Sequence, residues 1–356
     1  MMSRLSWCLG WLGTLLVCAD ARWSQITDPG SFRRESPEGS AWVSPEMPSP
    51  IPFRELVVSW NLREPVDLEV EVQARTGGVL GRWWHLGRWS GSPSSPWRTS
   101  VAGQRDGSGS VDTDTLMLAA PAEAIRLRVR FQEPSRTPAL LKRIDLAFWS
   151  PDGPTDRKGT GSTQPRAGAG VAPAPLEVPR RSQADDPEGV TRWCSPTSLS
   201  MLLAYWAGRS GRPEWDLDVR TVAAGVHDPG WPGTGNWAFN AAYAGSRPGL
   251  QAAAVRLGGL ADLQALLDAG IPVATSVSYA VLQGGARPEK GDGHLIVVCG
   301  IPGPTVIVND PGVRRSRVHR EFPVSAFLSS WEASHRTAYV VWPEGRNLPA
   351  SPLGTW

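Results

Sequence analysis

The sequence predicts an antiparallel all-β region followed by an α+β domain, with a linker between them. Apolar and polar residues alternate with a period of two over residues 66–73 and 125–132. This alternation is typical of strands with one buried and one solvated face. Residues 151–178 are rich in Pro, Gly, Ala and Thr, as linkers are. Beyond the linker, helix-like segments precede most strand-like segments, which is the order of an α+β fold.

The length and charge of the chain limit what it can be. Its 356 residues suffice for two domains with full-sized cores. Lys and Arg number 36 against 34 Asp and Glu, a formal net charge of +2. This near balance gives no reason to expect a nucleic-acid partner.

The first segment, 1–21, is interpreted as a signal peptide. Arg4 precedes the apolar stretch 5–17, and a small-x-small triplet ends at Ala21, where we expect cleavage. The apolar stretch is shorter than the ~20 residues of a spanning helix, which disfavours a membrane anchor. A lipoprotein signal through Cys18 is disfavoured because a valine precedes it. We therefore expect an exported protein, extracellular or periplasmic, without a transmembrane segment in the mature chain.

Two further segments precede the linker. Residues 22–51 are polar and Pro-rich and are expected to form an irregular leader. Residues 52–150 hold short apolar runs, separated by Gly, Ser and Pro, without helical stretches. Short strands at this spacing predict an antiparallel β-sandwich-like domain.

The second domain is expected at 179–345, with a tail at 346–356. Its first helix is expected to stop at Gly208, and a later one at Gly270. The expected elements are helices at 199–206, 260–267 and 324–331 and strands at 272–277, 295–300, 305–308 and 338–342.

The cysteines carry the first chemical signal. Cys8 and Cys18 would leave with the signal peptide, so Cys194 and Cys299 remain. Two cysteines are no disulfide framework for an exported protein, although they could pair with each other. Cys299 lies deep in an apolar strand and is expected to point away from His294, which argues against that disulfide.

Cys194 is a candidate nucleophile because of its place before an apolar helix. It stands in the string TRWCSPTSLSMLLAYW, and Pro196 is a residue favoured in the first turn of a helix. The N–H groups and dipole of a helix start favour a thiolate, which is the reactive form of cysteine. The alternative is a small buried apolar residue, the commoner fate of a lone cysteine.

His294 is the candidate base. It begins an apolar strand, and a second strand ends at Asp310. A hairpin with a three-residue loop at 301–303 would place these two side chains opposite each other on one face. An imidazole beside a carboxylate is the arrangement of a base and its orienting partner. A register slip of one residue would put Asn309 in the place of Asp310.

Four further residues are weaker candidates. Gln183, eleven residues before Cys194, carries a side-chain amide that could hold an oxyanion together with the backbone N–H of Cys194. Alone, such a glutamine is read as a surface residue. Trp193, Ser195 and Trp237 are candidates for the substrate cleft, although most tryptophans only pack.

Together these strings resemble a known family. They are Gln183 with the string around Cys194, Gly293-His294-Leu295, Asn309-Asp310-Pro311, and the segments 233–246 and 259–273. The combination is similar to cysteine peptidase family thirty-nine, papain-like enzymes known as the leader-cleaving domains of bacteriocin exporters. The likeness is greater to a free-standing, secreted bacterial branch, and it covers about 180–343.

The resemblance implies a papain-like fold and a role for four residues. Cys194 would be the nucleophile, His294 the general base, Asp310 its orienting partner and Gln183 the oxyanion-hole donor. Ser195 departs from the glycine often found after the nucleophile, which puts close substrate approach in doubt.

The function expected is therefore a secreted cysteine hydrolase, a peptidase that forms a thioester and needs no cofactor or metal. Its partner would be a peptide or protein. An amidase or acyltransferase with the same triad stays open. A non-catalytic module that binds a cell-surface polymer also stays open, with the N-terminal tryptophans Trp83, Trp84, Trp89 and Trp97 as stacking platforms or, more simply, as core.

Overall fold

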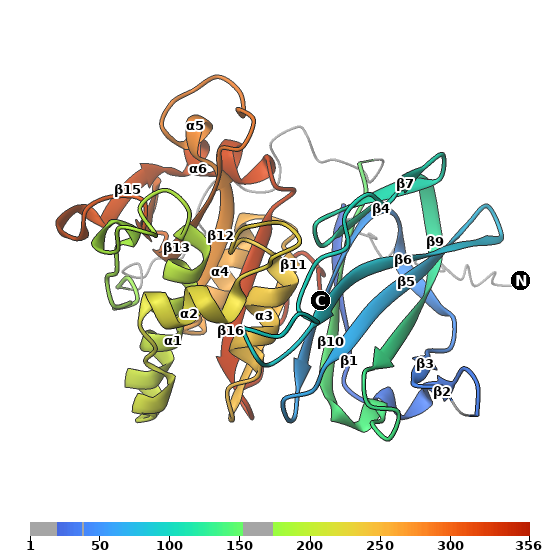
Figure 1. The fold of residues 1–356 in the computed structure, drawn as a ribbon. Coiled ribbons are helices and arrows are strands. Elements are labelled where there is room, and N and C mark those ends of the chain that lie inside the picture. The colour runs from blue at the N-terminus through green and yellow to red at the C-terminus, as the bar shows by residue number, and fades with distance from the viewer. Residues whose placement is uncertain (1–19, 38, 152–173) are drawn as a thin grey trace, which may run out of the picture.

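The computed structural model describes residues 20–37, 39–151 and 174–356. Most of the predicted signal peptide and linker lie outside these ranges. Figure 1 shows an all-strand N-terminal region beside a C-terminal region that mixes helices and strands. Within the described ranges, no helix has the length and apolar character to cross a membrane.

The N-terminal region is all-β, as predicted. Alternation at 66–73 and 125–132 corresponds to β5 and to the second half of β9, whose apolar residues are buried. The strands are β1 (Ala21–Ile26), β2 (Arg33–Arg34), β3 (Ala41–Val43), β4 (Met47–Leu62), β5 (Leu68–Thr76), β6 (Val79–Trp89), β7 (Arg105–Asp106), β8 (Gly109–Asp112), β9 (Thr115–Phe131) and β10 (Leu141–Trp149), with 3-10 turns at Pro29–Ser31 and Pro138–Leu140.

These strands form one connected antiparallel network. Its main path runs β1-β10-β4-β9-β3-β2, and β5, β6, β7 and β8 branch from it. The long strands β4 and β9 change partners along their length: β9 pairs with β8 at its start and with β5 and β3 at its end. Register shifts in the β4–β9 ladder mark where the strands bend.

The expectation of an irregular leader at 22–51 is wrong. This segment contributes β1, β2, β3 and the start of β4. β1 pairs with β10 along its whole length, and the buried Trp23 donates to Asp145 at 2.8 Å. The prolines of this segment misled the prediction because Pro48 lies within the edge-like first part of β4, where a strand tolerates a missing N–H.

The C-terminal region is an α+β unit, as predicted. The elements are α1 (Cys194–Ser210), α2 (Val219–Val226), α3 (Trp237–Gly245), β11 (Leu250–Arg256), α4 (Leu260–Asp268), β12 (Val273–Ser278), α5 (Tyr279–Leu282), β13 (Gly293–Gly300), β14 (Thr305–Asn309), β15 (His319–Pro323), α6 (Val324–Glu332) and β16 (Thr337–Pro343), with 3-10 turns at Gln183–Asp185, Pro213–Trp215 and Arg315–Arg317.

The antiparallel sheet of this region brings the chemical residues together. Its order is β11-β16-β12-β13-β14-β15, and α1 packs against β13 and β16. The start of α1 therefore lies beside the start of β13. The helix continues through Gly208 to Ser210 and ends at Gly211, whose φ of 63° suits glycine. The expected stop at Gly208 is thus corrected.

The two regions share a buried interface that the sequence did not reveal. Asn61 of β4 brackets a residue of β11: it donates to Ala252 O at 2.7 Å and accepts from Ala252 N at 2.9 Å. The Ser59 hydroxyl accepts from Ala254 N at 3.1 Å. Asn61 and Ser59 are fully buried. Side chains of the N-terminal region therefore satisfy the outer edge of β11.

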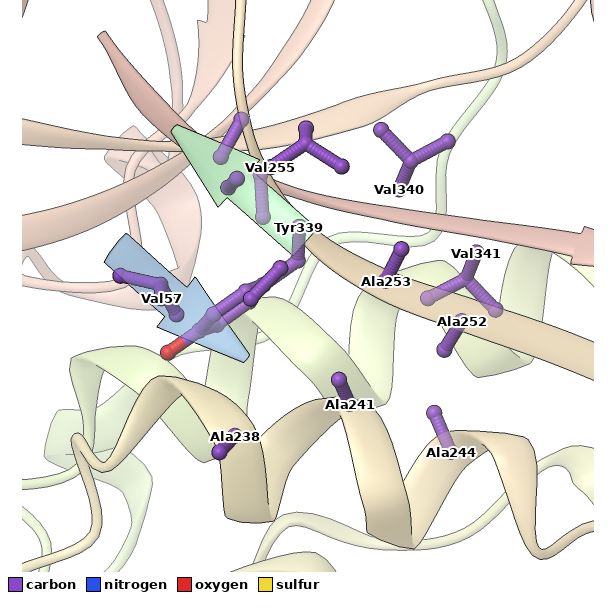
Figure 2. Packing of buried hydrophobic residues seen from close by; sticks show 14 of the residues in the cluster. Val57, Ala238, Ala241, Ala244, Ala252, Ala253, Val255, Tyr339, Val340 and Val341 are labelled. Carbon is purple, nitrogen blue, oxygen red and sulfur yellow. The ribbon is translucent and has the colours of Figure 1, made fainter. Parts of the chain in front are cut away.

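Small side chains let α3 pack closely between the two regions. Figure 2 shows Ala238, Ala241 and Ala244 along one face of the helix, pointing toward the strands. The helix contacts both β4 and β11. Residues 346–356, expected to be a tail, also pack against the N-terminal region, since the Trp356 ring lies 5.6 Å from that of Trp23.

Candidate active site

Cys194 is the first residue of α1, as predicted. Trp193 caps the helix, and its carbonyl accepts the first helical hydrogen bond from Thr197 N at 2.9 Å. The rest of the first turn is buried, whereas Cys194 keeps partial exposure. The thiol therefore combines contact with solvent and the N–H groups of a helix start.

His294 lies beside it at the start of β13. The residue is 7% exposed, and its Nε2 lies 2.8 Å from Asp310 Oδ1. The Tyr279 ring tilts over the imidazole with centroids 4.5 Å apart. Interaction with Cys194 raises the pKa of the same imidazole. Because Nε2 serves Asp310, Nδ1 is the nitrogen that remains for the thiol.

Asp310 is fully buried and accepts four hydrogen bonds. Oδ1 receives His294 Nε2 and, at 2.8 Å, Gly312 N. Oδ2 receives a guanidinium N–H of Arg320 at 2.7 Å and the Tyr279 hydroxyl at 3.2 Å. This saturation fixes the carboxylate as an acceptor for the imidazole.

The register expected between β13 and β14 is wrong, although the expected contact between His294 and Asp310 is present. Val297 pairs with Asn309, and a shift follows near the four-residue loop after Gly300. The true register thus differs by two positions from the expected one. A shift of two keeps every side chain on its face, so Asp310 still meets His294. Asn309 points away and donates to Val178 O at 3.0 Å.

The three groups have pKa values displaced in complementary directions. Burial would raise the pKa of the Cys194 thiol, but hydrogen bonding and charge from His294, with N–H groups of Leu295 and Ser195, lower it. Burial opposes the charged imidazole, yet Asp310 and Cys194 raise the pKa of His294 to about 9. Burial also opposes the Asp310 carboxylate, but His294, Gly312 and Arg320 lower its pKa to about 2. This combination favours a thiolate–imidazolium pair at neutral pH.

The alternative of a Cys194–Cys299 disulfide is excluded. Both cysteines are free thiols in the described part of the chain. Cys299 is 2% exposed, and burial raises the pKa of its thiol to about 12. It is an inert core residue, as expected from its apolar strand.

Gln183 is the first residue of the 3-10 turn Gln183–Asp185. It is buried, and its backbone N donates to Pro311 O at 3.0 Å, next to Asp310. Its side-chain Nε2 donates to Val190 O at 2.9 Å. An amide nitrogen carries two hydrogens, so one remains for a further acceptor.

The three candidate cleft residues separate into two groups. Trp193 and Trp237 keep partial exposure at the starts of α1 and α3. Ser195 does not belong to a cleft: it is 1% exposed, and its hydroxyl bonds to Asn240 Oδ1 and to the Tyr339 hydroxyl, both at 3.0 Å. The sequence could not show this because position 195 turns its side chain into the helix–sheet interface.

Sequence reasoning missed the residues that support the triad. Tyr279 and Arg320 contact Asp310 from α5 and β15. Gly312 is also constrained: a Cβ there would lie 2.8 Å from His294 Cε1. The only sequence signal for Arg320 was its place in a short alternating run, and its partner depended on a register that no motif fixes.

A hollow opens beside the imidazole. It has a volume of about 320 Å³ and is lined by Tyr279, Ala280, Glu289, Gly291, Asp292, Gly293 and His294. Its lining comes from α5, the loop before β13 and the first two residues of β13. This arrangement leaves open space on the His294 side of the site, next to two carboxylates.

Elsewhere, one group among the described residues has metal-ligand geometry. Glu69, Glu71 and His85 place ligand atoms within 4.8 Å of one another. Their carboxylates are engaged by arginines, with Arg88 Nε 3.2 Å from Glu69 and Arg128 Nε 2.5 Å from Glu71. The positive charge of these arginine side chains already compensates the two carboxylates, as a bound metal ion would.

Two of the four N-terminal tryptophans considered as stacking platforms belong to the core. Trp84 and Trp89 are 2% and 1% exposed, so neither can stack on a ligand. Trp83 and Trp97 are partly exposed but lie under guanidinium groups, Arg128 at 4.4 Å and Arg88 at 5.1 Å. This agrees with the packing interpretation for Trp84 and Trp89.

Two family models match the chain. Residues 11–145 match the model of the Peptidase C39 N-terminal domain, and residues 175–339 match that of the Peptidase C39 like family. No curated protein matches the chain.

Solved structures of such peptidases resemble parts of the chain. A C39-like peptidase from Bacillus anthracis is 17% identical, with 48% of this chain and 97% of that chain covered and a TM-score of 0.37. A double-glycine-motif protease from an AMS/PCAT transporter, solved with a leader peptide, is 18% identical over 51% and 98%, with a TM-score of 0.32. The peptidase domain of Streptococcus ComA is 18% identical over 43% and 93%, with a TM-score of 0.30.

The two family models together span most of the sequence, and the α+β region has the papain-like fold expected of them. The chain belongs to the C39-like family of cysteine peptidases.

Proposed function

We propose that this protein is an exported peptidase that cleaves peptide bonds with Cys194 as nucleophile, His294 as acid and base, and Asp310 as the partner that orients the imidazole. The observation that carries the proposal is the buried His294–Asp310 pair, 2.8 Å apart, together with Cys194 at the start of α1, whose thiol and the imidazole displace each other's pKa. Its pKa displacements are those that a thiolate nucleophile requires.

The reaction proceeds by acyl transfer. The Cys194 thiolate attacks the carbonyl carbon, and the oxyanion accepts hydrogen bonds from the Cys194 backbone N–H and the free N–H of Gln183. The imidazolium of His294 gives its proton to the leaving amine as the C–N bond breaks, which leaves a thioester. His294 then takes a proton from water, the hydroxide attacks the thioester, and the carboxylic acid product leaves with the thiolate restored.

The test compares the wild type, Cys194→Ala and the control Cys299→Ala on peptide libraries and cell-wall fragments. We expect hydrolysis by the wild type and by Cys299→Ala, because Cys299 is buried away from the triad. Cys194→Ala should lose activity and keep its melting temperature. Peptide hydrolysis that survives in Cys194→Ala would contradict the mechanism.

Two further measurements separate the alternatives. Iodoacetamide should alkylate Cys194 far below the pH at which an ordinary thiol reacts. A Cys194 as unreactive as an ordinary thiol would favour a binding module. Cleavage restricted to side-chain amides, or transfer of the acyl group to an added amine, would assign the triad to an amidase or acyltransferase.

We also propose export through the segment 1–21. Cleavage after Ala21 would remove Asp20, whose carboxylate pairs with Arg336 and whose carbonyl accepts from Ser150 N at 2.9 Å. β1 would then begin at Arg22. N-terminal sequencing of the protein recovered from the culture medium or periplasm tests the site, and an intact N-terminus in the cell pellet would contradict export.

A further inference from the structure

The segment 227–240 hydrogen-bonds residues that precede and follow Cys194 in the sequence. Thr234 Oγ1 donates to Arg192 O at 3.0 Å, two residues before Cys194. The Ser195 hydroxyl donates to Asn240 Oδ1 at 3.0 Å, one residue after it. Any shift of this segment therefore reaches the backbone around the thiol.

The N-terminal region holds the same segment. Asp114, in the turn between β8 and β9, accepts from the backbone N of Trp237, the first residue of α3. Asp228 accepts from Ser100 N at 2.9 Å. Asp114 is 5% exposed and Asp228 is fully buried. The Asp114 carboxylate complements the positive end of α3 and satisfies one of its unpaired donors, whereas Asp228 connects the segment to Ser100.

Buried amides connect these anchors to Ser195. Asn236 donates to Asp228 Oδ2 at 2.8 Å and caps α3 by accepting from Phe239 N at 3.0 Å. Asn240 donates to Thr234 O at 2.9 Å and to Asn236 O at 2.8 Å. Both donors of the Asn240 amide are used, so its orientation is fixed and Oδ1 is left to accept from Ser195.

Ser195 carries the effect to the thiol. Its hydroxyl lies between Asn240 and Tyr339, both at 3.0 Å, and its backbone N–H is one of the groups that lower the pKa of Cys194. Figure 2 shows Tyr339 on its strand above the helix that begins near Ala238. A buried network of this kind holds each member in a single geometry.

We propose that Asp114 is a positioning residue for Cys194, so that the N-terminal region completes the active site through the start of α3, Asn240 and Ser195. The proposal rests on the proposed function in taking Cys194 as the nucleophile. Asp114 itself touches neither substrate nor thiol.

The test is a double-mutant cycle with Asp114→Asn and Ser195→Ala. In Asp114→Asn, the amide presents an N–H group where the carboxylate accepted a hydrogen bond. Ser195→Ala removes the hydroxyl that connects Asn240 to the residue after Cys194. Asp112→Asn is the matched control, because Asp112 is exposed in the same turn. The readouts are the pH profile of iodoacetamide alkylation at Cys194, assigned by peptide mass mapping, and kcat/KM on a peptide substrate.

Each single substitution should move the alkylation midpoint of Cys194 to higher pH and lower kcat/KM by about tenfold, the size expected for a small displacement of a reacting group. The double variant should resemble the single ones, because both act through one chain of contacts. Asp112→Asn should match the wild type.

Additive effects, or a lower melting temperature with an unchanged alkylation profile, would overturn the proposal. If Asp114→Asn fails to fold, Ser195→Ala alone decides, and an unchanged profile in that variant overturns it. Alkylation that responds in a protein without peptide hydrolysis would refute the proposed function and keep the positioning role. Peptide hydrolysis by the wild type, with an alkylation profile that the substitutions leave unchanged, would refute the positioning role of Asp114 and keep the proposed function.

Discussion

Replacing Asp310 by Asn should narrow the pH range in which the enzyme is active. The side chain keeps its size but loses the charge that faces His294 Nε2 at 2.8 Å. An Asn can also turn an N–H toward Nε2, which favours the wrong tautomer of the imidazole. Arg320 and Tyr279 would then face a neutral amide in place of a carboxylate.

The structure sets the size of this effect. The pKa of His294 is raised from 6.5 to about 9. At 1.36 kcal/mol per unit, that displacement corresponds to about 3 kcal/mol of preference for the imidazolium. Burial opposes this preference, and Asp310 and Cys194 supply it. Because burial already reduces this net displacement, Asp310 and Cys194 together supply more than it. If Asp310 supplies half of their contribution, its loss lowers the pKa of His294 by at least about one unit and kcat/KM by at least about tenfold.

The assay is the pH profile of kcat/KM, which should be bell-shaped. The acid limb reports formation of the Cys194 thiolate and the alkaline limb reports loss of the His294 proton. In Asp310→Asn the alkaline limb should move to lower pH. Asp216→Asn is the control, since that carboxylate is exposed and pairs with Arg181. An alkaline limb that stays in place in Asp310→Asn would refute the assignment of Asp310.

Three other outcomes are expected. Asn61→Ala leaves the N–H and the carbonyl of Ala252 without hydrogen-bond partners. Because each unpaired buried group costs ~1–3 kcal/mol, denaturant titration should show a free energy of unfolding lower by about 2–6 kcal/mol. A loss under about 1 kcal/mol would contradict this expectation. Gly312→Ala places a Cβ 2.8 Å from His294 Cε1 and should lower kcat/KM by at least about tenfold with little change in melting temperature. The raised pKa of His294 contributes stability that is fully present below pH 6.5 and is lost as pH rises through about 9. The lowered pKa of Asp310 contributes stability that is present above pH 3.8 and is lost as pH falls through about 2. Melting temperatures across this pH range, compared between wild type and Asp310→Asn, test the direction of both effects.

Local patterns predicted much of the fold because the strands and helices carry their own periodicity. The alternation at 66–73 identified β5, and the apolar run after Cys194 identified α1. The leader at 22–51 escaped because its strands are short or proline-containing and gain stability from partners more than 80 residues away, such as β10 and β9. Such pairing depends on tertiary contacts that a local window does not contain.

The contact between His294 and Asp310 was predictable because it depends only on which face of the strand each side chain occupies. Cys194 was found from a helix start, and His294 met Asp310 despite a register error because the error was an even number of residues. The supporting network was not predictable. Asn240 and Asp114 read as ordinary polar residues. Only the packed structure shows that both are buried, that Asp114 bonds across the two regions to Trp237, and that Asn240 bonds to Thr234 within its own region.

The side chains of Asn61 and Ser59 also bear on how the protein behaves in a crowded compartment. β11 is the outermost strand of its sheet, and an open strand edge is a template for pairing with other chains. Asn61 occupies the N–H and the carbonyl of Ala252 along that edge, and Ser59 occupies the N–H of Ala254. The N-terminal region thereby acts as a permanent cover, and a C-terminal fragment made without it would present a bare edge and aggregate through it.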